Sequence, residues 1–128
     1  MHILVCGWSV AAVEEDPPWS YSIGVLEKFA HPELVVMDME IQAAGSLINY
    51  VGSQVRDGGG FLDHDALRAE GIRLVDVHER HMRSRLFKSW TRYYGEQPQA
   101  GDFVQILPPP ELFCPCHRHA YRRLDRVA

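Results

Sequence analysis

The residues of greatest chemical interest are His31 and Glu33, which flank Pro32 between two apolar segments. If this corner is extended, both side chains point roughly the same way, because alternate residues of an extended chain share a face. A carboxylate beside an imidazole fixes the tautomer of the histidine and raises its basicity, which suits a general base or a metal ligand. Hydroxyl groups could come from the preceding segment, at Tyr21 and Ser22. We therefore expect a ligand-binding pocket lined by these side chains.

A structural role for the same corner is the alternative. His31 and Glu33 would then form hydrogen bonds with the backbone and hold the turn between two strands. Pro32 fixes its own φ and biases His31 toward an extended conformation, which is a structural task in its own right. Both interpretations remain open at the level of the sequence.

A second candidate site lies near the end of the sequence, where thiols and imidazoles are concentrated. Thiolate and imidazole are the ligands that zinc prefers. The candidate ligands are Cys114, Cys116, His117 and His119, with a further ligand from His2, Cys6 or His81. One residue between paired cysteines is tighter than the spacing of most structural zinc sites. The alternative is an exposed, irregular tail with reactive thiols.

A third candidate is a basic stripe on an expected helix. The stripe comprises His81, Arg85, Lys88 and Arg92, at spacings of four, three and four, and His78 precedes it as a further member of the candidate site. Arg85 and Lys88 in particular could hold a phosphate or a carboxylate. The alternative is the ordinary solvated face of a surface helix.

The expected elements place these residues on a sheet and two principal helices. Alternation and β-forming residues predict strands at 3–10, 19–26, 34–38, 72–77 and 103–107. The first principal helix starts with Asp38 as its N-cap and Glu40 in its first turn, and it ends at the triple glycine 58–60. Its apolar stripe comprises Ile41, Ala44, Ile48, Val51 and Val55.

A shorter helical turn is expected at 65–71, and a second principal helix follows it. Ser84 caps this helix and Gly95 ends it. One face carries Leu86, Phe87, Trp90, Tyr93 and Tyr94. The order β-β-β-α-β-α-β predicts an α+β fold, with both helices packed on a mainly antiparallel sheet. The opening of the chain also resembles flavin-binding split barrels, so a split β-barrel is the alternative fold.

Composition narrows the class of protein. The 128 residues form a single domain, in which 108–128 is a tail rich in Pro, Cys, His and Arg. Three cysteines cannot all pair within the chain, which favours a reducing compartment. No apolar run approaches the roughly 18 residues that span a bilayer, so we expect a cytoplasmic protein without a membrane segment.

Charge is unevenly distributed along the chain. The net charge is −4, but residues 1–64 carry −7 and residues 65–128 carry +3. The basic half could attract an anionic ligand or let two copies pair head to tail, although an uneven solvated surface is the simpler interpretation. Overall acidity argues against nucleic-acid binding. Phosphate-loop, dinucleotide and nucleophile-elbow motifs do not occur in the sequence.

The strand Ser20-Tyr21-Ser22-Ile23-Gly24, followed by His31-Pro32-Glu33, resembles the core motif of DUF4262, a bacterial family of unknown function. The resemblance extends along the chain through Leu47-Ile48-Asn49, Val75-Asp76-Val77, Tyr93-Tyr94 and the strand with Gln105. The resemblance implies a fold but does not imply a reaction. The sequence departs from the family pattern at Leu107-Pro108-Pro109 and at 113–116.

Three functional hypotheses follow. The first is a small binding domain of this family, expected as a homodimer, with its pocket near the His-Pro-Glu corner. The second is a split-barrel-like flavin oxidoreductase, with the corner near the isoalloxazine and the basic helix near a phosphate. The third is a zinc-stabilised protein-interaction module built on the cysteine- and histidine-rich tail.

Overall fold

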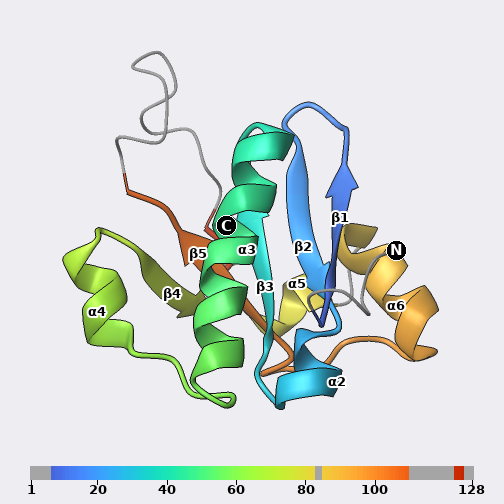
Figure 1. The fold of residues 1–128 in the computed structure, drawn as a ribbon. Coiled ribbons are helices and arrows are strands. Elements are labelled where there is room, and N and C mark those ends of the chain that lie inside the picture. Colours follow the sequence, from blue (N-terminus) through green and yellow to red (C-terminus); the bar gives the residue numbers. More distant parts are fainter. Residues whose placement is uncertain (1–6, 83–84, 110–122, 126–128) are drawn as a thin grey trace.

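The computed structural model describes residues 7–82, 85–109 and 123–125. Within these residues the chain forms an open five-stranded sheet in the order β1-β2-β3-β5-β4 (Figure 1). The strands are β1 (Ser9–Val13), β2 (Trp19–Ile23), β3 (Glu33–Met37), β4 (Arg73–Asp76) and β5 (Phe103–Leu107). Three of the four pairings are antiparallel, and β3 with β5 is parallel.

This arrangement confirms the α+β fold with a mainly antiparallel sheet. The split β-barrel alternative is wrong, because β1 and β4 are the two edges of an open sheet and do not pair with each other. The described helices are α2 (Val25–Phe29), α3 (Ile41–Asp57), α4 (His64–Ala69), α5 (Glu79–Met82) and α6 (Lys88–Tyr94), with a 3-10 turn η1 at Arg85–Phe87. None of them is long and apolar enough to cross a membrane.

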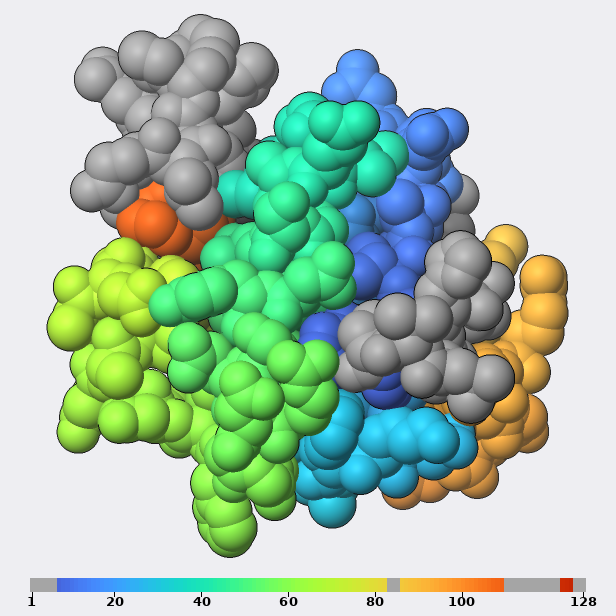
Figure 2. All heavy atoms as spheres, viewed as in Figure 1, coloured from blue at the N-terminus to red at the C-terminus, as the bar shows by residue number. Residues whose placement is uncertain are grey.

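Helices cover both faces of the sheet, so the molecule has three layers. Figure 1 shows α3 across one face, and α5 and α6 on the other. Figure 2 shows the same side with all atoms: α3 crosses the middle, flanked by α4 and by β1 and β2, with α2 at its lower end.

The middle strand β3 shows how the sequence produces these layers. Val35 and Met37 point into one apolar cluster, together with Trp90 of α6. Leu34 and Val36 point into the other cluster, which α3 supplies. Because successive side chains of a strand point to opposite faces, a strand covered on both sides reads as a continuous apolar run. All five residues of β3 are buried.

The first principal helix is confirmed, but its cap is different from the predicted one. The side chain of Glu40 accepts hydrogen bonds from the amides of Gln42 (2.9 Å) and Ala43 (3.0 Å), so Glu40 is the N-cap of α3. Asp38, the predicted cap, has a φ of 63° and belongs to the turn before the helix. The predicted stripe is buried from Ala44 to Val55, and the helix ends at Gly58.

The second strand is shorter than predicted. It ends at Ile23, because Gly24 adopts a φ of 118° and turns the chain into the short helix α2. A side chain at this φ would be strained, so the glycine is required for the turn. Val25, which was expected to continue the strand, is the first residue of α2 and is fully buried.

The second principal helix was predicted as continuous from Ser84, and the structure divides it. Its residues form η1 and α6, and the separate helix α5 precedes them, while Ser84 lies outside the described residues. Gly95 ends α6 in a left-handed conformation with a φ of 78°, as expected. Strand β5 has the predicted bounds. Within the described residues the first strand runs from Ser9 to Val13, and its predicted start at Ile3 lies outside the described part of the chain.

Candidate functional site

The carboxylate of Glu33 lies at the start of β3, where four hydrogen-bond donors surround it. Its Oε1 accepts from the hydroxyl of Ser22 (2.7 Å) and the amide of Val25 (3.0 Å). Its Oε2 accepts from the amide of Gly24 (3.0 Å) and the hydroxyl of Tyr94 (2.8 Å). The residue is 0% exposed. Each of the two carboxylate oxygens therefore accepts two hydrogen bonds from donors within the protein, which uses the accepting capacity of the group.

These contacts connect three elements through one side chain. The amides of Gly24 and Val25 begin α2, Ser22 belongs to β2, and Tyr94 ends α6. Burial raises the pKa of Glu33, and the hydrogen bonds from the α2 amides, Ser22 and Tyr94 oppose that rise. Glu33 is thus the polar centre of the corner, and it holds two helices against the sheet.

The hydroxyls expected to line a pocket are also engaged inside the fold. The Oγ of Ser22 donates to Glu33 and accepts from the amide of Leu34 (2.9 Å). The phenol of Tyr21 accepts from the amide of Ser89 (3.0 Å), in the first turn of α6. The ring of Tyr21 packs edge-on against Phe87 and Phe103. Both side chains are buried.

Tyr94 is a member of this cluster that the sequence interpretation did not connect with Glu33. Burial, followed by the charge of Glu33, raises the pKa of Tyr94, so its hydroxyl remains a donor at neutral pH. The aromatic pair Tyr93-Tyr94 stood out in the sequence, but nothing there indicates that the second ring reaches a residue 61 positions earlier.

His31 is the half-buried member of the predicted set. Its Nδ1 lies 2.8 Å from the carbonyl oxygen of Pro32. A carbonyl only accepts, so Nδ1 carries the proton and Nε2 keeps a lone pair. Burial lowers the pKa of His31, and the nearby imidazole of His64 lowers it further. His31 is therefore a neutral imidazole at pH 7, with Nε2 as an acceptor.

His64 also lines a pocket of about 360 Å³ between α4 and β4, which we call the α4–β4 pocket. Its other lining residues are Leu67, Arg68, Ile72, Arg73, Leu74 and Val75. His64 and Arg68 share one side of α4, since they are four positions apart. That spacing is visible in the sequence and could have identified the pair, but the sequence interpretation did not use it.

The residues of the basic stripe do not lie on one continuous helix. His81 belongs to α5 and Arg85 to η1, and Lys88 and Arg92 share α6. Lys88 and Arg92 are exposed. The spacing of four, three and four therefore does not describe one helical face.

The zinc ligands proposed at 114, 116, 117 and 119 lie outside the described residues. In the part of the chain that the structure describes, no group of three or more His, Cys, Asp or Glu side chains is placed to hold a metal ion. The flavin hypothesis was based on likeness to a split barrel, and the open sheet removes that basis.

Comparison with known proteins identifies a family. No curated protein and no solved structure matches the chain. The model of a domain of unknown function, DUF4262, matches residues 2–111. This range includes the His-Pro-Glu corner, the sheet and the described helices. The chain therefore belongs to the DUF4262 family of domains of unknown function.

Proposed function

We propose that this domain binds a small organic anion, and that the anion occupies the α4–β4 pocket. The observation that carries the proposal is the composition of the pocket wall. Arg68, Arg73 and His64 contribute cationic or hydrogen-bonding groups, while the remaining lining residues are apolar. Ligand pockets of this size combine apolar walls with a few polar groups that orient the ligand.

The two arginines are suited to a carboxylate or a phosphate, because a guanidinium can donate two parallel hydrogen bonds to either group. Arg68 lies 3.4 Å from Asp65, but both side chains are well exposed, at 65% and 92%. An exposed pair of this kind is weak and leaves the guanidinium able to reorient toward a ligand. Arg73 has no ion pair within the described residues.

The pocket is linked to the His-Pro-Glu corner through His64. This imidazole lines the pocket and is close enough to His31 to lower its pKa. In this proposal Glu33, Ser22 and Tyr21 shape the corner from beneath, and His31 acts on the pocket through its neighbour His64.

An exposed aromatic side chain lies in the loop that leads into α4. Phe61 is 82% exposed and precedes His64 by three residues. The adjacent Gly60 lies against the end of α2, where a Cβ would come within 2.5 Å of the carbonyl oxygen of Phe29. The loop that carries Phe61 is therefore held next to the corner.

The test uses benzoate as the probe and benzamide as a neutral probe of the same shape. Chemical shifts of the backbone amides and histidine rings would be followed by NMR during titration. We expect benzoate to shift His64 and the amides of 67–75, and benzamide to act much more weakly. Arg73→Gln should weaken benzoate binding by about tenfold, since a charge-assisted bidentate contact is lost.

Arg92→Gln is the matched control. Arg92 is also an exposed arginine, but it lies on α6, in the opposite layer of the molecule. Its replacement changes the net charge equally and should leave benzoate binding unchanged. Equal weakening in both variants would indicate a general charge effect and would contradict the proposed pocket.

A further inference from the structure

Residues 123–125, which we call the tail segment, are docked on the face of the sheet that α5 and α6 cover. The side chain of Leu124 is 3% exposed and belongs to the apolar cluster with Val77, Met82 and Phe103. Its backbone amide donates to Oε1 of Gln105 over 2.6 Å. Its carbonyl accepts from the amide of His78 over 2.7 Å. Leu124 is thus held by its side chain and by both of its backbone polar groups.

The receiving site has a polar centre in an apolar strand. Gln105 is 0% exposed and lies in β5, opposite Val35 of β3 and Val75 of β4. A buried side-chain amide is costly unless hydrogen bonds satisfy it. Leu124 supplies one of those bonds. The side chain of Gln105 thus bonds to the backbone of another segment, beside an apolar cluster that buries the leucine of that segment. Hydrogen bonds to the main chain, combined with burial of a side chain, are a recurring way in which domains bind extended peptides.

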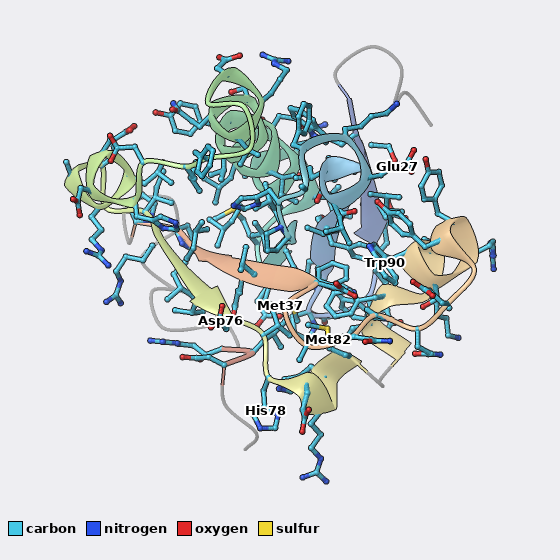
Figure 3. The ribbon with its side chains drawn as sticks, turned by 90° about the horizontal axis from the view of Figure 1, so that it is seen from below. Glu27, Met37, Asp76, His78, Met82 and Trp90 are labelled. Atoms are coloured by element: carbon cyan, nitrogen blue, oxygen red, sulfur yellow. The ribbon has the colours of Figure 1, made fainter. Side chains whose placement is uncertain are left out.

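The rest of the site comes from the chain between β4 and α5. Figure 3 labels His78 just beyond the end of β4, with Asp76 before it and Met82 on the following helix. His78 presents its backbone amide to the tail segment, while Val77 contributes to the apolar cluster. Recognition therefore combines one side-chain acceptor, one backbone donor and an apolar cluster that buries one leucine side chain.

The tail segment is preorganised by its own side chains. Arg123 donates to both oxygens of Asp125, over 3.1 Å from Nε and 2.7 Å from Nη2. Both side chains are only about a quarter exposed, at 26% and 27%. A two-point contact of this kind fixes the residue between them, so Leu124 is presented in one conformation and less entropy is lost on docking.

The site and its occupant belong to different parts of the sequence. Gln105 and His78 lie inside the range that the family model matches, residues 2–111, whereas Leu124 lies beyond it. We propose that the domain carries a peptide-binding site at Gln105 and His78 for a leucine flanked by arginine and aspartate, and that the tail segment occupies this site in cis. A peptide of the same pattern from another protein would compete with it. This site lies in the layer opposite α3 and does not depend on the α4–β4 pocket.

The test uses a fluorescein-labelled peptide with the sequence of residues 119–128 and fluorescence anisotropy with the full chain. Leu124→Asp displaces the tail segment and leaves the receiving site unchanged. The labelled peptide should bind this variant about tenfold or more tightly than it binds the wild type, because a tethered competitor acts at millimolar effective concentration. A peptide carrying the same leucine-to-aspartate change should bind neither protein.

Gln105→Met in the Leu124→Asp background removes the acceptor and retains the length of the side chain. It should abolish binding of the labelled peptide. Equal affinity of the peptide for the wild type and for folded Leu124→Asp would overturn the proposal.

Hydrogen exchange on the wild type keeps the proposal testable if Leu124→Asp does not fold. The amide of Leu124 should exchange faster than the amide of Leu34 in β3, because the tail segment opens without global unfolding. Excess unlabelled peptide should accelerate that exchange further. Exchange of Leu124 only at the rate of global unfolding, unaffected by peptide, would mean that the segment is a permanent part of the core and would overturn the proposal.

Discussion

Tyr94 donates its phenolic hydroxyl to Glu33 over 2.8 Å, and this bond joins the last residue of α6 to the first residue of β3. The two residues are 61 positions apart, and no helical or strand periodicity relates them. The bond completes the set of donors around a carboxylate that is wholly removed from solvent. It therefore makes the position of α6 depend on the corner.

Tyr94→Phe should lower the free energy of unfolding by about 1–3 kcal/mol, because a buried charged acceptor loses one of its donors. Tyr93→Phe is the matched control. The hydroxyl of Tyr93 bonds to Glu27 over 2.8 Å, but this pair is exposed, so its loss should cost much less. Urea denaturation of the three proteins measures both values. Equal costs would show that the burial of Glu33 does not strengthen the bond.

The pKa of Glu33 also predicts a dependence of stability on pH. Since burial raises that pKa above its ordinary value of 4.5, the folded protein holds the proton more tightly than the unfolded chain does. The contribution of Glu33 to stability is then fully present below pH 4.5 and is lost as the pH rises through the folded-state pKa.

Urea denaturation between pH 4 and pH 8 measures this contribution as the difference between wild type and Glu33→Gln. The stability of the wild type relative to the variant should fall with increasing pH across the window that begins at 4.5. A difference that grows with pH would mean that the hydrogen bonds outweigh burial and that the folded-state pKa is lowered.

The contribution of His31 to stability depends on pH in the opposite direction. Burial and the neighbouring His64 lower its pKa below 6.5, so the fold favours the neutral imidazole. This stability is present above pH 6.5 and is lost as the pH falls through the folded-state pKa. NMR titration of the His31 ring should give a midpoint below 6.5, and His64→Gln should move that midpoint upward. An unchanged midpoint in His64→Gln would show that the two imidazoles are too distant to influence each other and that the corner is not linked to the pocket.

Two glycines of α3 should respond to alanine in opposite directions. A Cβ at Gly52 would lie 2.7 Å from Cζ2 of Trp8, whose ring is buried and held by a hydrogen bond to Asn49. Gly52→Ala should therefore destabilise the protein by about 1–3 kcal/mol through overpacking. Gly45 meets nothing within 4 Å, so Gly45→Ala should stabilise it by about 0.5–1 kcal/mol through helix propensity. Thermal and urea denaturation would reveal the sign of each change.

The elements whose ends were predicted most closely have either a long periodic pattern or clear boundaries in the sequence. Helix α3 carries its stripe over 17 residues, and β5 is bounded by a loop and prolines, so both are recognisable from local sequence. Helix α2 was missed because it has five residues, and Val25 and Leu26 look like a continuation of the strand before them. Gly24 was the local signal of the change.

The candidate site, like the fold, could be predicted from the sequence only in part. The importance of the corner is visible in the sequence, because proline, histidine and glutamate are adjacent there. The partners of Glu33 are not visible, because they depend on how α2 and α6 pack against the sheet. The pairing of Leu124 with Gln105 is likewise a tertiary contact, and no spacing rule relates a loop residue to a strand 19 positions earlier.

The parallel pairing of β3 with β5 has a consequence for how the chain folds. Strand β5 comes last in sequence among the strands, yet it lies between β3 and β4. Until residue 103 has been synthesised, β3 has no neighbour on one side and β4 has no strand to pair with. The closure of the sheet must therefore wait for a contact across most of the domain, and contacts of such high sequence separation slow folding. On the ribosome this domain would complete its sheet late, in a single step that joins its two halves.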